Sequence, residues 1–142
     1  MRGLARSAVV SCLLSVLSAP AMAICTDEQK LGEVLYANNS SYFSSEDARH
    51  LDEIKQLAMD KKDGYLLLEF NVFAITDNEK LRHYNLWLAK RRIERVKHYL
   101  NTEPLPVPII TRIRTASSQE RRDVDILWCE SSAISGNSAN HY

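Results

Sequence analysis

The residue pair best suited to binding chemistry lies in the run TDNEKLRHYNLWLAKRR, which spans positions 76–92. Asp77 follows an apolar run of strand length at 66–74, where the Asp-Asn dipeptide supplies the turn chemistry that ends a strand. Arg92 lies fifteen residues farther on, in a segment with helical periodicity. If the turn folds back against this helix, a carboxylate that accepts from an ammonium group faces a guanidinium that grips a carboxylate through two bonds. The spacing therefore favours a site for a zwitterionic ligand, with a plain Asp77–Arg92 salt bridge as the alternative.

An amphipathic helix that ends near Leu100 must position Arg92. Two stripes of residues recur along it at steps of three and four, about 100° apart round the helix axis. The first stripe is expected to face a core, and the second places Arg92 at the border between core and solvent. The first consists of Leu86, Ala89, Ile93, Val96 and Leu100, and the second of Asn85, Leu88 and Arg92.

Five residue pairs carry a family resemblance: Thr76-Asp77, Tyr84-Asn85, Leu88-Ala89, Arg91-Arg92 and Tyr99-Leu100. At these spacings the chain resembles the peptidoglycan-binding motif of the OmpA-like domain family. In that family, the Asp and the second basic residue hold the two ends of the diaminopimelate side chain in the peptidoglycan stem peptide. The resemblance therefore implies that Asp77 and Arg92 bind the ligand, that Thr76 and Asn85 support them, and that Leu88 lies beside them.

The chain departs from the family pattern at three positions. Ala74 and Lys80 stand where the family has glycines, and Ala89 stands where it has a serine. Glycines at such places supply positive φ or a close backbone approach, and Lys80 adds a cation near Asp77. These departures favour altered or weakened binding.

The resemblance covers residues 33–128 and adds two residues to the predicted site. Asn39 matches a family Asn that borders the ligand, and an ordinary turn Asn is its alternative. Arg121 begins the run RRDVDI, which resembles the family's closing segment, where the first Arg supports the site from beneath. Ion pairing of Arg121 and Arg122 with Asp123, Asp125 or acids of the helices is favoured over direct contact with an anionic ligand.

Periodicity and turn chemistry predict a strand–helix–strand–helix–strand–strand order. With the resemblance, this order implies an α+β sandwich of the OmpA-like kind, with a mixed sheet and two helices on one face. The first helix is expected to begin after an N-cap at Ser44 or Ser45 and to end near Met59. Predicted strands cover 32–37, 66–74, 109–115 and 121–128, and the predicted buried residues of the first helix are Leu51, Ile54, Leu57 and Ala58.

The first 23 residues have the three parts of a secretory signal peptide: Arg2 and Arg6, an apolar core at 8–17, and a small-x-small site at 21–23. We expect cleavage after this site and a periplasmic location. No lipid anchor is expected, because Cys12 has too little apolar chain before it and Cys25 follows an isoleucine where a small residue is required. No later run reaches the ~18 apolar residues of a membrane helix.

The predicted mature chain has one domain at 24–130 and a disordered polar tail at 131–142. The signal peptide carries two of the 18 basic residues and none of the 18 acids, which leaves a charge near −2 and argues against nucleic acid as a partner. Cys25 and Cys129 remain, and in an oxidising compartment a disulfide between them is favoured over two buried thiols.

Other chemistries find little support. The four histidines do not fall at metal-ligand spacing with one another or with cysteine, so neither a metal nor a cofactor is expected. No serine or cysteine nucleophile has a supporting motif, so the chain is not expected to be an enzyme. Tyr84 and Trp87 suggest stacking on a sugar ring, with packing in or at the edge of the core as the favoured alternative.

The sequence therefore predicts a periplasmic protein, associated with the outer membrane, that binds peptidoglycan noncovalently through diaminopimelate. The alternative is an adaptor or assembly subunit of an envelope machine, such as a flagellar motor or a secretion system, with weakened or lost wall binding. Since the chain has neither a predicted barrel nor a lipid, a tethering role would need a partner protein of the outer membrane or of an envelope complex.

Overall fold

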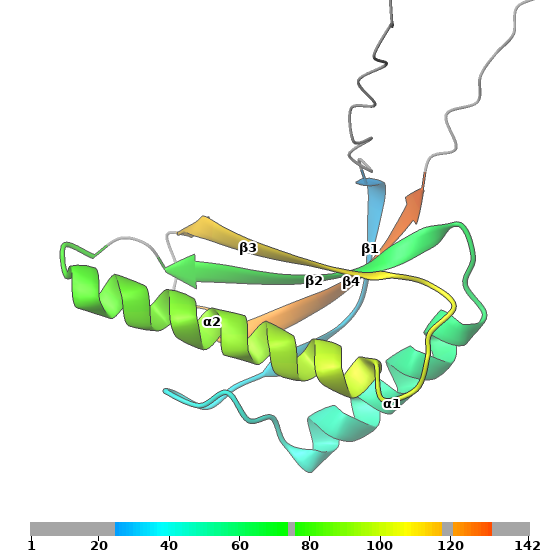
Figure 1. Ribbon diagram of the computed structural model, residues 1–142, viewed down its shortest axis with the longest axis horizontal. Helices are drawn as coiled ribbons and strands as arrows, with labels where there is room; N and C mark the ends of the chain where they lie inside the picture. The colour runs from blue at the N-terminus through cyan, green and yellow to red at the C-terminus, as the bar shows by residue number, and fades with distance from the viewer. Residues whose placement is uncertain (1–24, 74–75, 118–120, 132–142) are drawn as a thin grey trace, which may run out of the picture.

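The computed structural model describes residues 25–73, 76–117 and 121–131 (Figure 1). The predicted signal peptide at 1–23 and residues 132–142 of the predicted tail lie outside the described residues, whereas Ser131, the first residue of that predicted tail, is the last residue of a strand. Within the described ranges, strands and helices follow the predicted order. They are β1 (Cys25–Leu35), α1 (Ser45–Met59), β2 (Gly64–Phe73), α2 (Glu79–Leu100), β3 (Ile109–Ser117) and β4 (Asp123–Ser131).

The four strands form one mixed sheet with the order β1-β4-β2-β3. β4 is antiparallel to both of its neighbours, and β2 and β3 are parallel. This arrangement follows from chain connectivity, because α2 provides the crossover that two parallel neighbouring strands require. Both helices lie on the same side of the sheet (Figure 1), as predicted.

The main core lies between this face of the sheet and the helices. The two central strands, β2 and β4, are buried along most of their length, although Glu69, Asp123 and Asp125 place charged side chains among their apolar residues. The predicted inward face of β4 is confirmed, as is most of the predicted core stripe of α2. The core includes Leu66, Leu68, Phe70, Ala89, Ile93, Val96, Leu100, Val124, Ile126 and Trp128.

Helix α1 begins as predicted. The Ser44 hydroxyl accepts from the Asp47 backbone N–H at 3.1 Å, and the Asp47 carboxylate accepts in return from the Ser44 N–H. The predicted burial of Leu57 is wrong, because its exposed fraction is 54%. Leu57 lies about 120° round the axis from Leu51, the centre of the buried face. Lys55, nearer to that centre, is buried instead and donates to the Thr102 hydroxyl at 3.1 Å.

Strand β1 is longer at its start than predicted, since it begins at Cys25 and not at residue 32, and it ends at Leu35. Its first half, CTDEQKL, has no strand alternation because this half of an edge strand is largely exposed. Antiparallel pairing with β4 holds this half of β1 at the edge of the sheet. The pairing has register shifts between Cys25 and Glu28 and between Lys30 and Gly32.

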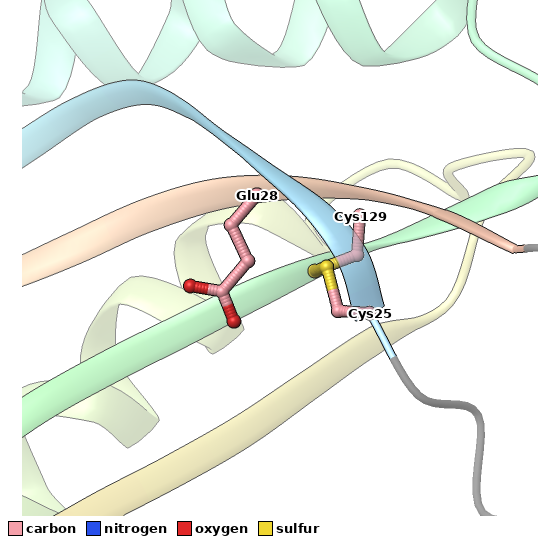
Figure 2. Close-up of side chains that lie close together, drawn as sticks. All are labelled: Cys25, Glu28 and Cys129. Carbon is pink, nitrogen blue, oxygen red and sulfur yellow. A yellow bond between two sulfur atoms is a disulfide. The ribbon is translucent and has the colours of Figure 1, made fainter.

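The predicted disulfide is confirmed: Cys25 of β1 is bonded to Cys129 of β4, with their Cα atoms 5.4 Å apart (Figure 2). Glu28 lies close to the two sulfur atoms, and its carboxylate accepts from Arg112 at 2.8 Å. The bond therefore fixes the first residue of β1 to β4, one of the two central strands of the sheet.

Neither helix in the described part of the chain is long and apolar enough to cross a membrane.

Candidate ligand-binding cavity

A cavity of about 270 Å³ lies between the start of α2 and the end of β2. Four segments contribute to its lining: the loop after β1, the last residues of β2, the first half of α2, and the segment that leads into β4. The lining residues are Asn38, Asn39, Phe70, Val72, Phe73, Leu81, Asn85, Leu88, Arg92, Arg121 and Arg122.

Helix α2 contributes the second stripe that the sequence predicted. Asn85, Leu88 and Arg92 all line the cavity, and Leu81 extends the stripe by one turn toward the helix start. The prediction that Arg92 lies at the border with solvent is wrong, because only 4% of this residue is exposed. The loop after β1 covers Arg92, and the sequence alone did not place that loop over the helix.

Arg92 anchors this loop. Its Nε donates to the Ser40 carbonyl at 2.8 Å, and a terminal guanidinium nitrogen donates to the Ala37 carbonyl at 3.1 Å. The guanidinium carbon also lies 5.0 Å from the centre of the Tyr36 ring and 5.6 Å from that of the Phe70 ring, distances at which a cation is attracted to an aromatic face. Arg92 is thus a structural residue of the cavity as well as a source of positive charge.

The anchored loop presents Asn39 in the left-handed backbone region, with φ at 54°. Among residues with a side chain, Asn is one of the few that tolerate this conformation at low cost. The loop geometry therefore explains both why an Asn occurs here and why its side chain lies at the cavity. The predicted placement of Asn39 beside Arg92 and Asn85 agrees with the lining.

Tyr36 connects the start of the loop to the backbone of α2, because its hydroxyl donates to the Arg92 carbonyl at 3.1 Å. Burial raises the pKa of Tyr36 far above its ordinary value of 10.0, although the positive charge of Arg92 opposes this shift. A phenol that stays neutral in the folded state stabilises the fold fully below pH 10, and this contribution is lost as rising pH ionises the phenol of the unfolded chain.

Replacing Tyr36 with Phe is expected to lower the free energy of unfolding by about 1 kcal/mol at pH 7, the usual net value of one hydrogen bond. The loss of stability between pH 10 and 11 should also be shallower in Tyr36→Phe than in the wild type. Urea denaturation at several pH values measures both effects. Equal alkaline slopes in the two proteins would show that Tyr36 does not ionise on unfolding in this range.

Thr76 and Asp77 lie outside the described lining of the cavity, although the sequence predicted them as part of the site. Asn78 is the N-cap of α2 and accepts from the Leu81 N–H at 3.1 Å, while the Thr76 hydroxyl accepts from the Asn78 N–H at 3.2 Å. Asp77 is exposed in this turn, four residues before the cavity residue Leu81. The structure therefore brings Arg92 together with the predicted residues on α2 and on the loop, but not with Asp77.

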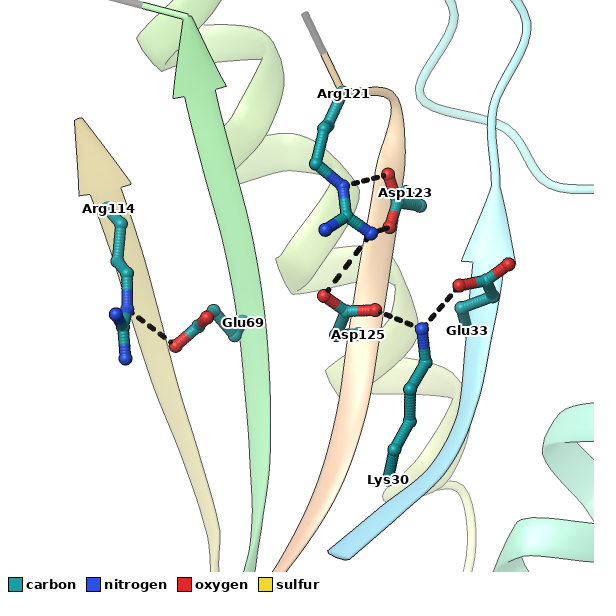
Figure 3. A network of polar contacts seen from close by, with 7 residues as sticks. All are labelled: Lys30, Glu33, Glu69, Arg114, Arg121, Asp123 and Asp125. Carbon is teal, nitrogen blue, oxygen red and sulfur yellow. Dashed lines mark hydrogen bonds and ion pairs between the residues drawn. The ribbon is translucent and has the colours of Figure 1, made fainter. Parts of the chain in front are cut away.

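Arg121 has two roles that the sequence treated as alternatives. It lines the cavity, and it also forms the predicted ion pairs, with Asp123 through two nitrogens and with Asp125 at 3.7 Å (Figure 3). The hydrogen bond to Asp123 raises the pKa of Arg121. Lys30 neutralises Asp125 from β1 at 2.8 Å, and its own pKa is raised by that contact and by Glu33.

This network occupies the sheet face opposite the helices (Figure 3). Three of its acids, Glu33, Asp123 and Asp125, have carboxylate oxygens within 4.8 Å of one another, which is close enough for a shared cation. Lys30 and Arg121 already supply that positive charge. Ion pairing therefore accounts for this cluster without a metal.

The chemistry of the cavity is cationic and amide-rich. Arg92, Arg121 and Arg122 supply guanidinium groups, Asn38, Asn39 and Asn85 supply amides, and no acid is among the described lining residues. Guanidinium and amide N–H groups are the donors that bind carboxylates. Sequence reasoning missed Asn38, which adjoins Asn39, and Leu81, which continues the helical stripe; it had weighed Arg122 as a ligand contact but favoured ion pairing for it.

The sequence favoured packing of Tyr84 and Trp87 in the core or at its edge, but neither residue is in the described core or among the partly buried residues packed against it. Their exposed fractions are 39% and 50%, and their rings stack on each other with centres 5.7 Å apart. They lie on α2 but are not part of the described cavity lining.

The fold is of the OmpA-like kind: two helices cover one face of a four-stranded mixed sheet. The solved structures similar to it include the crystal structure of the peptidoglycan-associated lipoprotein from Burkholderia pseudomallei, with a TM-score of 0.50. The match covers 68% of this chain and 88% of that chain at 17% sequence identity. No protein-family model matches the sequence, and no curated protein matches it either.

Proposed function

We propose that this protein binds peptidoglycan noncovalently in the cell envelope, and that the cavity beside Arg92 receives the diaminopimelate of the stem peptide. The observation that supports this proposal most is the composition of the cavity, which is lined by three arginines and three asparagines, with no acid among the described lining residues. One of these arginines, Arg121, is paired with Asp123 and Asp125. Such a space suits a ligand carboxylate. The fold shared with a peptidoglycan-associated lipoprotein supports the same reading, and so does the Cys25–Cys129 disulfide, since such bonds persist in oxidising compartments.

In this proposal the cavity holds the carboxylate end of the ligand. Arg92 contributes charge and holds the loop, Asn39 and Asn85 donate from opposite walls, and Leu88 contacts the aliphatic part. Arg121, which is paired with Asp123 and Asp125, bounds the cavity from the β4 side. The ligand's ammonium group then extends toward Asp77, whose carboxylate is exposed in the turn before α2. Thr76 supports this turn through its bond to the Asn78 N–H.

The test is co-sedimentation of the purified protein with isolated sacculi. We expect Asn85→Ala and Asp77→Ala each to reduce the bound fraction about tenfold, the usual effect of one hydrogen bond to a charged group. Asn39→Gly is a matched variant of the loop, because glycine keeps the positive φ and removes only the side chain, and it should also weaken retention. Lys62→Ala, in the exposed turn after α1, should bind like the wild type.

One observation favours a second function. Because Asp77 lies outside the described cavity lining, the ammonium end of the ligand has weaker support than its carboxylate end. An adaptor or assembly subunit of an envelope machine would retain the fold with this binding reduced. Absence of wild-type retention on sacculi would support the adaptor and refute wall binding. Release of soluble muropeptides in the same experiment would refute both, because it would reveal an enzyme.

A further inference from the structure

A second and larger groove, of about 650 Å³, runs along the outer side of α2. It shares no lining residue with the cavity beside Arg92. One wall is formed by successive turns of α2 from Trp87 to His98, about 16 Å of helix at 1.5 Å per residue. The other wall includes Tyr42 and Phe43, in the segment that leads into α1. The groove is therefore long enough for several residues of an extended or helical peptide.

The described lining of the groove has an excess of positive charge. Its lining contains Lys90, Arg91, Arg95 and His98 but only one acid, Glu94. Within the described residues, none of the first three forms an ion pair with an acid.

The sheet face opposite the helices differs in this respect. There Arg112, Arg114 and Arg121 are each paired with a carboxylate of the chain itself. The excess of cations in the groove is thus a local feature, which an acidic partner would complement.

The aromatic residues of the groove define the rest of the partner's chemistry. Tyr42 is 70% exposed and Trp87 is 50% exposed. Arg95 lies over the Tyr42 ring at 3.8 Å and Arg91 lies 5.2 Å from the centre of the Trp87 ring. A guanidinium stacked on a ring keeps its N–H donors available at its edge, so each pair offers an apolar surface beside a donor to carboxylate.

These contacts disfavour a carbohydrate in the groove. A sugar ring stacks on an open aromatic face, but here Arg95 lies over Tyr42, and Tyr84 and Arg91 both lie against Trp87. Phe43 meets Tyr99 edge to face, with an angle of 89° between the rings. The rings of the groove are thus partly covered by guanidinium groups and by one another, which suits a polypeptide better than a glycan.

We propose that this groove binds an acidic segment of a partner polypeptide in which carboxylates alternate with apolar side chains. The carboxylates contact Arg91, Arg95 and Lys90, and the apolar side chains contact Trp87 and Tyr42. Aromatic and arginine residues are the types that contribute most to the free energy of binding at protein interfaces. The site is separate from the cavity, so it does not depend on peptidoglycan binding.

The test uses a fluorescein-labelled peptide of Glu alternating with Leu and Phe, and a second peptide with Lys in place of Glu. Fluorescence anisotropy with the purified protein should show saturable binding of the acidic peptide only, and high salt should weaken it. The peptides lack tryptophan and Trp128 is only 3% exposed, so a change in protein emission on binding reports on Trp87.

Two variants locate the binding in the groove. Trp87→Ala is expected to weaken the acidic peptide at least tenfold, and the double variant Arg91→Glu/Arg95→Glu should abolish its binding and create binding of the basic peptide. The matched control, Arg49→Glu/Lys62→Glu, makes the same change of charge at exposed positions outside the groove and should bind like the wild type. Unchanged thermal melting confirms that each variant is folded.

Four outcomes would overturn the proposal: no binding of the acidic peptide to the wild type, equal binding of the two peptides, competition by glycan strands stripped of their peptides, and a concentration-dependent dimer abolished by Trp87→Ala. The third would assign the groove to carbohydrate and the fourth to a second copy of this chain. Retention on sacculi by Arg91→Glu/Arg95→Glu is measured in parallel, so that failure of this proposal is distinguished from failure of the cavity to bind peptidoglycan.

Discussion

Removing the disulfide with Cys25→Ser/Cys129→Ala is expected to lower the free energy of unfolding by about 2–5 kcal/mol. The two cysteines are 104 residues apart, so the bond restricts most of the unfolded domain, and the chain-entropy model gives about 4.7 kcal/mol for a loop of this length. Cys129 is fully buried, and alanine avoids placing a hydroxyl group there. Urea denaturation measures the change.

Reduction supplies the control for this prediction. The wild type in dithiothreitol should lose about as much stability as the double variant, and the double variant should not respond to the reductant. Hydrogen exchange locates the effect, since amides at 25–31 are held at the sheet edge by the bond and by β4 and should exchange faster without it. A loss below about 1 kcal/mol in both experiments would contradict a stabilising role for the bond.

The start of β1 also illustrates which parts of this fold a sequence can predict. β2 and β4 carry apolar side chains on the face that the helices cover, and the helices have caps and stripes, so the existence of these elements follows from local patterns. Residues 25–31 lack such a pattern, because an exposed edge strand is held by its partner and not by its own burial. Their strand structure depends on contacts with β4, nearly a hundred residues away in the chain.

Some features of the candidate site could likewise be predicted from local patterns, and others could not. Asn85, Leu88 and Arg92 share a helical stripe, and the spacing alone predicted that they would meet. The burial of Arg92 was not predictable, because the loop that covers it is held by contacts with carbonyl groups, which any sequence provides. The position of Asp77 depends on which of two adjacent capping residues begins α2, and the choice of Asn78 over Asp77 moves the carboxylate to the solvent side.

Replacing Arg92 with methionine, which retains a long apolar side chain, is expected to lower the free energy of unfolding by about 3 kcal/mol. A hydrogen bond from a charged donor contributes about 1.5–3 kcal/mol, and this side chain donates to two carbonyl groups, Ala37 O and Ser40 O. Loss of these bonds removes the side-chain anchor of the loop that carries Asn39, although the Ala37 carbonyl still accepts from the Ser40 N–H. Retention of Arg92→Met on sacculi should also fall, because the substitution removes a positive charge from the cavity and releases the loop that carries Asn39.

Two further variants separate these effects. Arg92→Lys keeps the charge, but a single ammonium group does not reproduce a planar fork with donors in two directions, so most of the stability should still be lost. Arg95→Met makes the same chemical change one turn along α2. Within the described residues this guanidinium donates to the Ser41 hydroxyl and stacks on the exposed Tyr42, so the change should cost less than about 1 kcal/mol. If Arg92→Met were as stable as Arg95→Met and remained bound to sacculi, Arg92 would neither hold the loop nor serve the cavity, and the proposed site would lose its central residue.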